Sequence, residues 1–574
     1  MKKGALNLLI GGPAGAGIEK SGRTTAISFL RGGYFVFANV EHMSQIRGGN
    51  NYLRLRIDEK PHASHVEEID IMIALDKQTV EEHIGEVVDG GAVIYDSDEL
   101  DLSDVETGGA LMVGVPLKKM ATEELGNAIM ANVISLGLVS GLVKFDVGMI
   151  KKVLGKVFEK KGAEVIKLNE KAADMGYELA GKWANDFHVE MSGGSATTAT
   201  AGSSKGNMFI EGNDAFALGA LKAGCKYVGE YPMTPSSSIL HFMAKWAEKY
   251  GVVVKHTEDE ISACNSAIGA GFAGVRALTA TSGGGFALMG EAIGLAGMNE
   301  VPCVIANVMR PGPATGLPTR TDQGDLRQVI HAGQGDPVKL VLLPGSVEEC
   351  FYYGFEAFNL AEKYQLPVIV CFDKHLGEGY FTVPPFDESG LKVDRGKLVT
   401  ENPGEDYKRY LRTEDGISPR TIPGVKGGIH RATSDEHDEY GDITEDAENR
   451  NLMVEKRMQK VANAAAECPK PELIGDAGAE VTFVTWGSSV GICKEAAELH
   501  GNANVLQIKT AYPFHAKEVK EILEVAKRPI LVEHNFTGQM GGLIAEGTGI
   551  IIEEKVLRYD GRPMTAKYII DRIK

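Results

Sequence analysis

The chain has 574 residues, a formal net charge of −18 and 43% apolar residues. Such a length exceeds what one hydrophobic core supports and predicts roughly three or four domains. The negative charge disfavours nucleic acid or an anionic membrane as a partner, and no apolar run is long enough to span a bilayer. Because the N-terminus does not resemble a signal peptide, we expect a cytoplasmic protein.

Residues 1–185 alternate strand-like apolar runs with helical periods, which predicts an α/β domain. Its first strand enters a glycine-rich sequence in which Gly15 and Gly17 fit a dinucleotide-binding G-x-G-x-x-G motif, although Lys20 stands at the third position. The second strand ends in Glu41, a residue type that binds ribose hydroxyls. The pattern is therefore typical of either a structural turn or a nicotinamide site.

The rest of the chain divides into four segments. Residues 186–207 contain the small-residue run "SGGSATTATAGSSKG" and predict a linker. Residues 208–386 alternate buried strands with helices, which predicts a second α/β domain with a largely parallel sheet. Residues 387–471 are polar and predict an irregular connecting segment, and residues 472–574 predict a smaller α/β domain. The predicted fold class is therefore multidomain α/β, built from parallel-sheet domains.

The sequence "EYPMTPSSSI" places Thr234 between two prolines, directly after a predicted strand. A proline fixes its own φ and pushes the preceding residue towards extended geometry, so Thr234 should be firmly oriented. With Pro235 at the first helical position, Thr234 is typical of a helix N-cap. It is equally placed to bind a ligand at the carboxyl end of a strand.

The sequence "HTEDEISACNSAIGAG" predicts a helix that begins among three carboxylates, Glu258, Asp259 and Glu260. Carboxylates in a first turn stabilise the helix dipole, which is one interpretation. The other is that one of them exchanges a proton with a cofactor. The helix has a face of very small residues, which predicts close packing next to a subunit boundary: Ala263, Ala267, Ala270 and Gly271.

Arg310 follows a run of mostly apolar residues and opens the loop "PGPATGLPTRTDQGDL". Pro311 and Pro313 restrict the backbone beside it. An arginine here is either a solvated loop residue or a carboxylate ligand. We favour recognition of a substrate anion, because a guanidinium binds carboxylates as a planar fork.

Two features argue against a metal centre on this chain. The seven cysteines are scattered without any C-x-x-C pair, unlike a zinc ribbon or a ferredoxin-type cluster. The acidic run around Glu436, His437, Asp438 and Glu439 predicts a solvated loop, because sequential ligands rarely converge on one ion.

Taken together, several motifs resemble the α subunit of the 2-oxoacid:ferredoxin oxidoreductases, in the form with a γ domain fused ahead of α. The motifs are "YPMTPSS", "EDEISACNSAIGAG", "TATSGGGFALMGEAIGLA", "MRPGPATGLPTRTDQGDL" and "VEHNFTGQMGG". The N-terminal "EHMSQIRGGNNYLRLRI" looks like the γ module. The resemblance covers essentially the whole chain and implies that one domain is of the pyrimidine-binding type found in thiamine enzymes.

The resemblance implies an activity. Enzymes of this family cleave a 2-oxoacid next to its carbonyl with thiamine diphosphate, transfer the acyl group to coenzyme A and pass two electrons to ferredoxin; several also run in reverse. The "PGPATGLPT" loop resembles the 2-oxoglutarate branch more than the pyruvate branch, and pyruvate or broad specificity stays an alternative. A nicotinamide-dependent dehydrogenase and a non-catalytic scaffold are the other two hypotheses.

The resemblance also assigns roles to residues. Thr234 and Arg310 match the residues that hold the 1-carboxylate of the 2-oxoacid, and Thr319 is expected to meet a distal carboxylate. Glu260 best matches the glutamate that hydrogen bonds the pyrimidine ring of the cofactor. Glu258, two residues away, is a second candidate.

The chain lacks a "GDG" motif followed by asparagine, the usual loop for a metal-bound diphosphate. The resemblance therefore implies a partner β subunit that holds the diphosphate, Mg²⁺ and a 4Fe–4S cluster. Ferredoxin is expected to dock on that subunit. The expected assembly is a heterodimer or a dimer of heterodimers.

Overall fold

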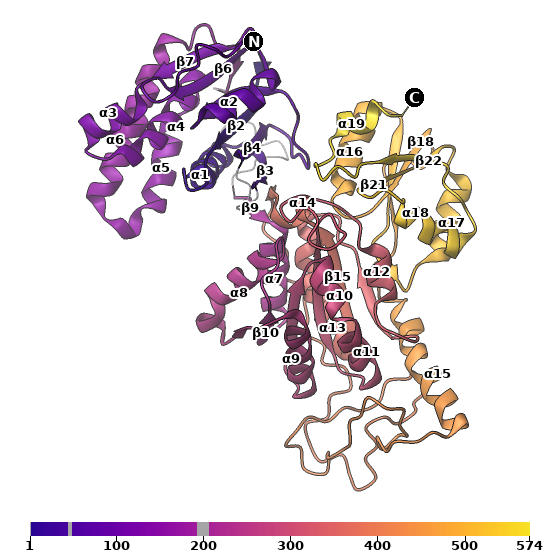
Figure 1. Cartoon of the computed structure of the whole chain (residues 1–574). Helices are drawn as coiled ribbons and strands as arrows, with labels where there is room; N and C mark the ends of the chain where they lie inside the picture. The colour runs from indigo at the N-terminus through magenta and orange to yellow at the C-terminus, as the bar shows by residue number, and fades with distance from the viewer. Residues whose placement is uncertain (1, 44–48, 192–205, 574) are drawn as a thin grey trace. The chain divides into compact units, whose positions relative to one another are not determined.

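The computed structural model describes residues 2–43, 49–191 and 206–573 (Figure 1). The chain forms two compact units. Unit 1 comprises Met1–Ile210 and Gly379–Pro385, and unit 2 comprises Glu211–Glu378 and Phe386–Lys574. Most of the predicted linker, residues 192–205, lies outside the described residues. The predicted boundary at 471 stays a prediction within unit 2.

Unit 1 is built on one mixed sheet. Its strand order is β7-β6-β5-β2-β4-β3-β16-β9. The strands are β2 (Leu6–Gly12), β3 (Phe35–Glu41), β4 (Asn51–Asp58), β5 (Ile69–Ala74), β6 (Val87–Asp96), β7 (Leu111–Val115), β9 (Met208–Glu211) and β16 (Tyr380–Val383). Strands β2, β5, β6 and β7 run parallel, whereas β4 pairs antiparallel with β2 and β3. Only one half of this sheet therefore has the parallel pairing predicted from the sequence.

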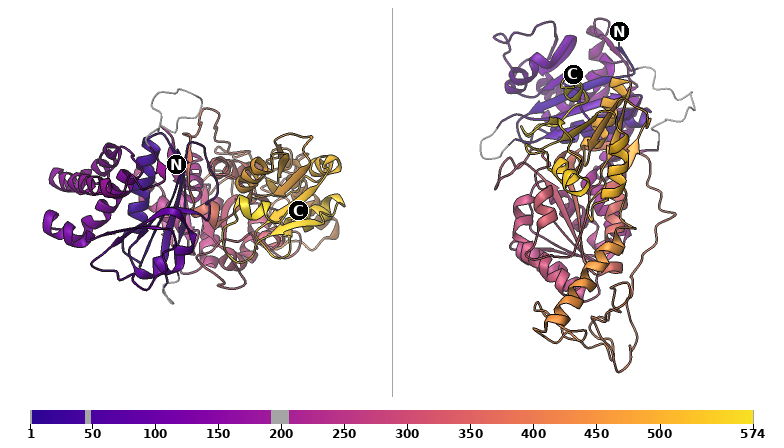
Figure 2. Two further views of the ribbon diagram at one scale, coloured as in Figure 1. Left: turned by 90° about the horizontal axis from the view of Figure 1, so that it is seen from above. Right: turned by 90° about the vertical axis from the view of Figure 1, so that its right-hand side faces the viewer.

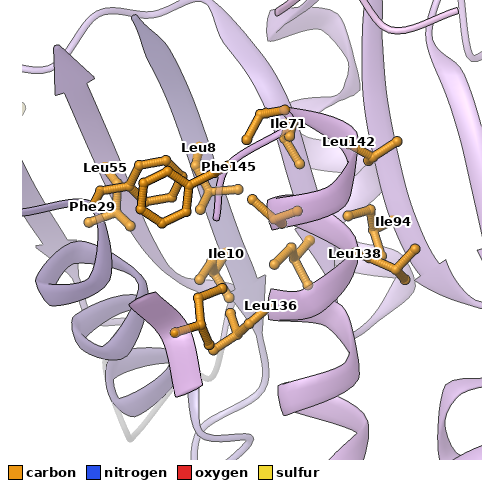
Figure 3. Close-up of a cluster of buried hydrophobic side chains, with 14 of the residues drawn as sticks. Leu8, Ile10, Phe29, Leu55, Ile71, Ile94, Leu136, Leu138, Leu142 and Phe145 are labelled. Atoms are coloured by element: carbon orange, nitrogen blue, oxygen red, sulfur yellow. The ribbon is translucent and has the colours of Figure 1, made fainter. Parts of the chain in front are cut away.

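The helices of unit 1 bury an aliphatic core against this sheet (Figure 3). The helices are α1 (Ile18–Arg31), α2 (Lys77–His83), α3 (Leu117–Leu125), α4 (Ala131–Leu142), α5 (Val147–Val157) and α6 (Ala163–Leu179). Leu136 and Leu138 of α4 lie in the same cluster as Ile10 and Ile94 of the strands. Burial of such side chains supplies the main stabilisation of the unit. A short parallel pair, β1 (Lys2–Lys3) with β8 (Val189–Glu190), lies outside the sheet.

Strand β16 comes from a distant part of the sequence. It pairs antiparallel with β3, and Thr382 Oγ1 both donates to Val36 O and accepts from Val36 N–H. Residues 379–385 therefore group with unit 1. The sequence analysis assigned them to the domain 208–386, which is wrong for this segment, because its partner strand lies over 300 residues earlier.

Unit 2 contains a larger sheet with the order β11-β10-β12-β13-β15-β14-β20. The strands are β10 (Tyr227–Glu230), β11 (Val253–His256), β12 (Ala277–Thr281), β13 (Cys303–Met309), β14 (Leu340–Leu342), β15 (Pro367–Asp373) and β20 (Thr510–Tyr512). All neighbours pair in parallel except β14 with β20. The predicted α/β fold with a largely parallel sheet is confirmed here.

Helices pack on this sheet along its whole width. They are α7 (Gly212–Lys222), α8 (Ser237–Tyr250), α9 (Glu260–Phe272), α10 (Gly283–Leu288), α11 (Gly290–Met298), α12 (Leu326–His331), α13 (Val347–Tyr364) and α14 (Lys374–Glu378). Helix α9 packs on β10 and β12, and α13 packs on β13 and β15. Along the part of the chain that the structure describes, no helix combines the length and apolarity needed to cross a membrane.

The C-terminal part of unit 2 carries a second, smaller sheet with the order β17-β19-β18-β21-β22. The strands are β17 (Glu472–Ile474), β18 (Val481–Thr485), β19 (Ala503–Gln507), β21 (Pro529–Glu533) and β22 (Glu554–Leu557). The helices are α16 (Ser489–His500), α17 (Ala516–Val525), α18 (Gln539–Thr548) and α19 (Ala566–Ile570). Strand β20 leaves this region and joins the larger sheet.

The segment 387–471 is irregular as predicted up to residue 446, but it then forms helix α15 (Ala447–Ala464), which the sequence analysis missed. Figures 1 and 2 show α15 as a continuous helix beside the irregular stretch. Lys456 and Lys460 on α15 are buried and both bind the carboxylate of Glu300. A buried charge without a partner is strongly destabilising, so α15 can bury these two lysines only because Glu300 pairs with both.

The acidic run at residues 436–439 is not a solvated loop. His437 is buried, and Glu436 forms ion pairs with Arg450 and Arg457. Burial opposes ionisation of Glu436, but the hydrogen bonds from these arginines lower its pKa to about 2. Among the described residues, no group of three or more acidic, histidine or cysteine side chains is arranged to hold a metal ion.

The start of α8 also differs from the prediction. Helix α8 begins at Ser237, and its N-cap is Ser236 rather than Thr234. The backbone N–H of Ser236 bonds to the carbonyl of Met233 at 2.8 Å, which closes a turn before the helix. Thr234 lies inside this turn, so it caps nothing and stays at the carboxyl end of β10.

Candidate active site

The residues singled out by the sequence meet at one edge of the large sheet in unit 2. Strands β11, β10, β12 and β13 are neighbours and run parallel, so their carboxyl ends lie at the same edge. Thr234 follows β10, Glu260 follows β11, and Arg310 comes directly after β13. Open α/β sheets bind their ligands at this edge.

Arg310 is held in place by the turn that contains Thr234. Its Nη1 donates to the carbonyl oxygen of Thr234 at 2.7 Å. Its Nε is buried and has no hydrogen-bond partner among the residues that the structure describes. Burial lowers the pKa of Arg310, while the charges of Asp325 and Glu260 act in the opposite direction. The guanidinium is thus oriented by one bond and retains a donor for a ligand.

The three carboxylates at the start of α9 have different environments. Asp259 is the N-cap, and its carboxylate accepts from the N–H of Ser262 at 2.7 Å. Glu258 is exposed to solvent. Glu260 is only 3% exposed, and its Oε1 is buried without a partner. A buried polar atom without a partner is costly unless a ligand satisfies it, so the geometry favours Glu260 over Glu258.

The backbone approaches Glu260 closely at Gly285 in α10. A Cβ atom at this position would lie 2.5 Å from Glu260 Oε1 and 2.2 Å from Thr281 Oγ1. Only glycine therefore leaves the carboxylate in its observed place. The unpaired Oε1 fits a ligand with a ring nitrogen, such as an aminopyrimidine, which offers a hydrogen-bond partner to a carboxyl group.

The small-residue face of α9 packs closely within its own domain. Ala263 and Ala267 are fully buried, and Gly271 is buried with them. This face packs on β10 and β12 of the same sheet. The exposed side of the helix instead carries Ile261 and Phe272. The prediction of close packing is confirmed, and a subunit boundary next to the start of this helix stays a prediction.

The loop after Arg310 is folded back on itself. The N–H of Leu317 bonds to the carbonyl of Pro311, and Gly316 adopts a positive φ of 55°. Thr319 lies in this loop and is half-buried. Its position in the same loop as Arg310 is compatible with a second contact to a substrate, which stays a prediction.

Sequence reasoning missed one residue of the site, Asp325. It is 9% exposed and accepts from Asn307 Nδ2 of β13 at 3.2 Å. Its charge acts on Arg310. Asp325 lies in "TDQGDL", at the end of the loop that Arg310 opens. The signal in the sequence was a carboxylate at the end of a loop that already held two candidate ligands, Arg310 and Thr319.

In unit 1, the glycine-rich turn borders a cavity of about 570 Å³. Gly15, Gly17, Lys20, Arg23 and Glu41 all line it. Gly17 adopts a φ of 85° at the start of α1, as a tight turn requires. Glu41 ends β3 as expected and accepts a hydrogen bond from Asn39 Nδ2. The glycines thus form a tight turn at the start of α1, and charged side chains from this turn and from β3 line the cavity.

Two family models match the chain. Residues 218–456 match the thiamine diphosphate-binding domain of pyruvate flavodoxin/ferredoxin oxidoreductases, and residues 7–179 match a pyruvate ferredoxin/flavodoxin oxidoreductase domain. The α subunit of a 2-oxoacid:ferredoxin oxidoreductase from a Sulfolobus species is 33% identical, over 97% of this chain and 95% of that one. The chain belongs to the 2-oxoacid:ferredoxin oxidoreductases, as an α subunit.

Other members of the family agree with this. The α subunit of 2-oxoacid:ferredoxin oxidoreductase 2 from Aeropyrum pernix is 34% identical, over 99% of this chain and 97% of its own length. A subunit of 2-oxoglutarate synthase, KorA, from Methanothermobacter thermautotrophicus is 38% identical over 58% of this chain and 88% of its own.

One solved structure covers the whole fold. The 2-oxoglutarate:ferredoxin oxidoreductase from Magnetococcus marinus, determined with 2-oxoglutarate, coenzyme A and succinyl-CoA bound, has a TM-score of 0.90 and 31% identity. The match covers 100% of this chain and 99% of that one. The predicted family and the thiamine-enzyme domain are therefore confirmed.

Proposed function

We propose that this chain supplies the pyrimidine-binding and carboxylate-binding half of an active site that oxidatively decarboxylates a 2-oxoacid. The products are an acyl-CoA and CO₂, and the electrons go to ferredoxin. The proposal rests chiefly on one observation: Glu260 Oε1 and Arg310 Nε are both buried without partners at the same edge of the sheet. Family membership gives the class of reaction. In that reaction Glu260 serves as the acid–base group and Arg310 as the anion-binding group.

Glu260 is the residue that holds the cofactor on this chain. When bound, thiamine diphosphate supplies the nucleophilic carbon that attacks the 2-oxoacid and accepts the electrons of the broken bond. Glu260 Oε1 lies in a site closed to water, where it exchanges a proton with a nitrogen of the bound ring. Gly285 lets the carboxylate keep this place, because a Cβ atom here would lie 2.5 Å from Glu260 Oε1.

Arg310 and Thr234 bind the 1-carboxylate of the substrate. Arg310 offers a planar fork of donors, and its bond to the Thr234 carbonyl fixes the direction of that fork. Because the carboxylate leaves as CO₂, its orientation relative to the carbonyl decides the rate of the bond cleavage. Thr319, in the same loop, contacts the distal end of the substrate.

We favour 2-oxoglutarate as the substrate. The resemblance of the "PGPATGLPT" loop to that branch supports this choice, as do the names of two relatives, a 2-oxoglutarate synthase subunit and a 2-oxoglutarate:ferredoxin oxidoreductase. Pyruvate or a broad range of 2-oxoacids is the alternative. The reverse reaction, fixation of CO₂ on an acyl-CoA, belongs to the same proposal.

We further propose that a β subunit completes the site. It would hold the diphosphate, Mg²⁺ and a 4Fe–4S cluster, and ferredoxin would dock on it, in a heterodimer or a dimer of heterodimers. All seven cysteines of this chain are buried free thiols at separate positions. Free thiols of this kind also fit a cytoplasmic enzyme.

Purification of the chain together with its partner tests the proposed function. We expect the complex to contain iron and thiamine diphosphate, and to reduce a viologen dye with 2-oxoglutarate and coenzyme A faster than with pyruvate. Faster turnover of pyruvate would reassign the substrate. A complex that contains neither iron nor thiamine diphosphate and reduces no dye would contradict the reaction itself.

A nicotinamide-dependent dehydrogenase is the second candidate, because Lys20 and Arg23 line the cavity over the glycine-rich turn of unit 1. A rise in melting temperature of the complex with NADH would favour it. The scaffold hypothesis predicts instead that Arg310→Ala leaves the activity of the complex intact.

A further inference from the structure

Asp325 is a buried carboxylate at the end of the loop that Arg310, the proposed substrate ligand, opens. It lies directly before α12, and its Oδ2 accepts from Asn307 Nδ2 on β13 at 3.2 Å. A Cβ atom on Gly283 would lie 2.4 Å and 2.5 Å from its two oxygens. The backbone of the glycine-rich start of α10 thus encloses the carboxylate and holds it in a fixed place.

Several charged groups face Asp325 from the surrounding elements. Arg310, after β13, attracts its negative charge, and Glu260, at the start of α9, acts on the same guanidinium. Burial, together with the charges of Asp325 and of Asp373 at the end of β15, raises the pKa of Asp322, in the loop before α12, to about 7. Cys371 on β15 is also close, but burial raises the pKa of its thiol, so it stays neutral.

We propose that Asp325 takes up a proton when Arg310 binds the carboxylate of the 2-oxoacid, and releases it when that carboxylate leaves as CO₂. The inference rests on the proposed function, because it requires Arg310 to be the carboxylate ligand. Asp325 does not touch the reacting atoms. It acts through Arg310 and is a positioning residue whose charge changes with the state of the site.

The physical reason is a competition for one positive charge. In the free protein, burial raises the pKa of Asp325 to about 6, although the Asn307 hydrogen bond and the charge of Arg310 lower it. A substrate carboxylate at Arg310 offsets that attraction and adds a second negative charge nearby. Both effects raise the pKa of Asp325 further, so a protein with ionised Asp325 gains a proton on binding.

The sign of the pH dependence follows from this. Below pH 6 Asp325 is already protonated, so binding takes up no proton and affinity is highest. As pH rises above 6, each binding event must protonate Asp325, and affinity falls until the pKa of the complex is reached. When C1 leaves as neutral CO₂, Arg310 again has Asp325 as an anionic neighbour, and the proton returns to solvent.

Calorimetry of the complete complex with 2-hydroxyglutarate tests the proposal. This analogue keeps both carboxylates but has no carbonyl to react. Titrations at pH 7 in buffers of different ionisation enthalpy give the number of protons taken up. We expect a clear uptake, approaching about one proton, at pH 7 and almost none at pH 5, with uptake absent in Asp325→Asn.

The asparagine variant can still bond to Asn307, which favours normal folding. Being permanently neutral, it should bind more tightly at pH 8 than the wild type, by about tenfold for each unit by which binding raises the pKa of Asp325. A merely structural role would weaken binding at every pH. Asp322→Asn, in the same loop, is the matched control and should keep the uptake.

The outcomes separate the two claims. Binding without proton uptake by the wild type at pH 7, or uptake that persists in Asp325→Asn, would overturn the inference and leave the proposed function intact. If a variant does not fold, the absence of uptake by the wild type at pH 7 would still overturn the inference, because Asp325 and Asp322 are the groups of this loop that titrate near that pH. A wild-type complex that neither binds the analogue nor turns over any 2-oxoacid would overturn both.

Discussion

Replacing Glu260 with glutamine should leave a folded complex with almost no activity. Glutamine has nearly the same shape, so the close contact with Gly285 is preserved. An amide cannot hold and exchange the proton that we assign to Glu260 Oε1. General acid–base groups contribute about 10²–10⁴-fold, so we expect kcat for the reduction of viologen by 2-oxoacid and coenzyme A to fall by about that factor.

The matched control is Glu258→Gln, which changes an exposed carboxylate two residues away. It should retain wild-type kcat. The KM for the 2-oxoacid should not rise in Glu260→Gln, because the change removes a negative charge that acts on Arg310. If the Glu260 variant kept near wild-type activity while the Glu258 variant lost it, the assignment would move to Glu258.

Replacing Arg310 with lysine should lower kcat/KM for the preferred 2-oxoacid by about 10- to 100-fold. A lysine keeps the positive charge but cannot bind the Thr234 carbonyl and a carboxylate with one planar fork. Losing one such charged hydrogen bond costs about 1.5–3 kcal/mol. Steady-state kinetics with varied 2-oxoacid and saturating coenzyme A measure this change.

Arg327→Lys serves as the control. This arginine lies on α12 and forms an exposed ion pair with Glu546, so exchanging it should change kcat/KM little. An unchanged kcat/KM in Arg310→Lys would remove Arg310 from the substrate site. Intact activity in Arg310→Ala as well would favour the scaffold hypothesis.

The sequence predicted the parallel strands of unit 2 well, because fully buried strands such as β13 and β15 read as continuous apolar runs. It predicted α8 less well. Pro235 is a common first residue of a helix, yet here it lies in the turn closed by Met233 and Ser236. The pattern could not show that turn, because proline is a common residue of turns as well as of helix starts.

Two other features depend on distant contacts that no local pattern reports. Helix α15 carries lysines on its buried side, where an apolar stripe is expected, and Glu300 neutralises them from more than 150 residues away. Strand β16 is short and completes the sheet of the other unit. Local periodicity therefore predicted neither helix α15 nor the grouping of residues 379–385 with unit 1.

The candidate site was predictable in its main residues but not in its details. Glu258, Asp259 and Glu260 are equivalent in the sequence, and only the fold separates the cap, the exposed residue and the buried one. Asp325 was missed because its hydrogen bond from Asn307 and its close contact with Gly283 come from other elements of the fold.

The most direct test of the division of labour is a comparison of this chain alone with the chain joined to its β subunit. Calorimetry with thiamine diphosphate and Mg²⁺, iron content and viologen reduction with 2-oxoglutarate and coenzyme A are measured on both samples. We predict that the isolated chain is colourless, binds the cofactor weakly and turns over no 2-oxoacid, and that the β subunit restores all three properties together. A brown, active preparation of this chain by itself would contradict the account, because the electrons would then have a path that its seven separate cysteines do not provide.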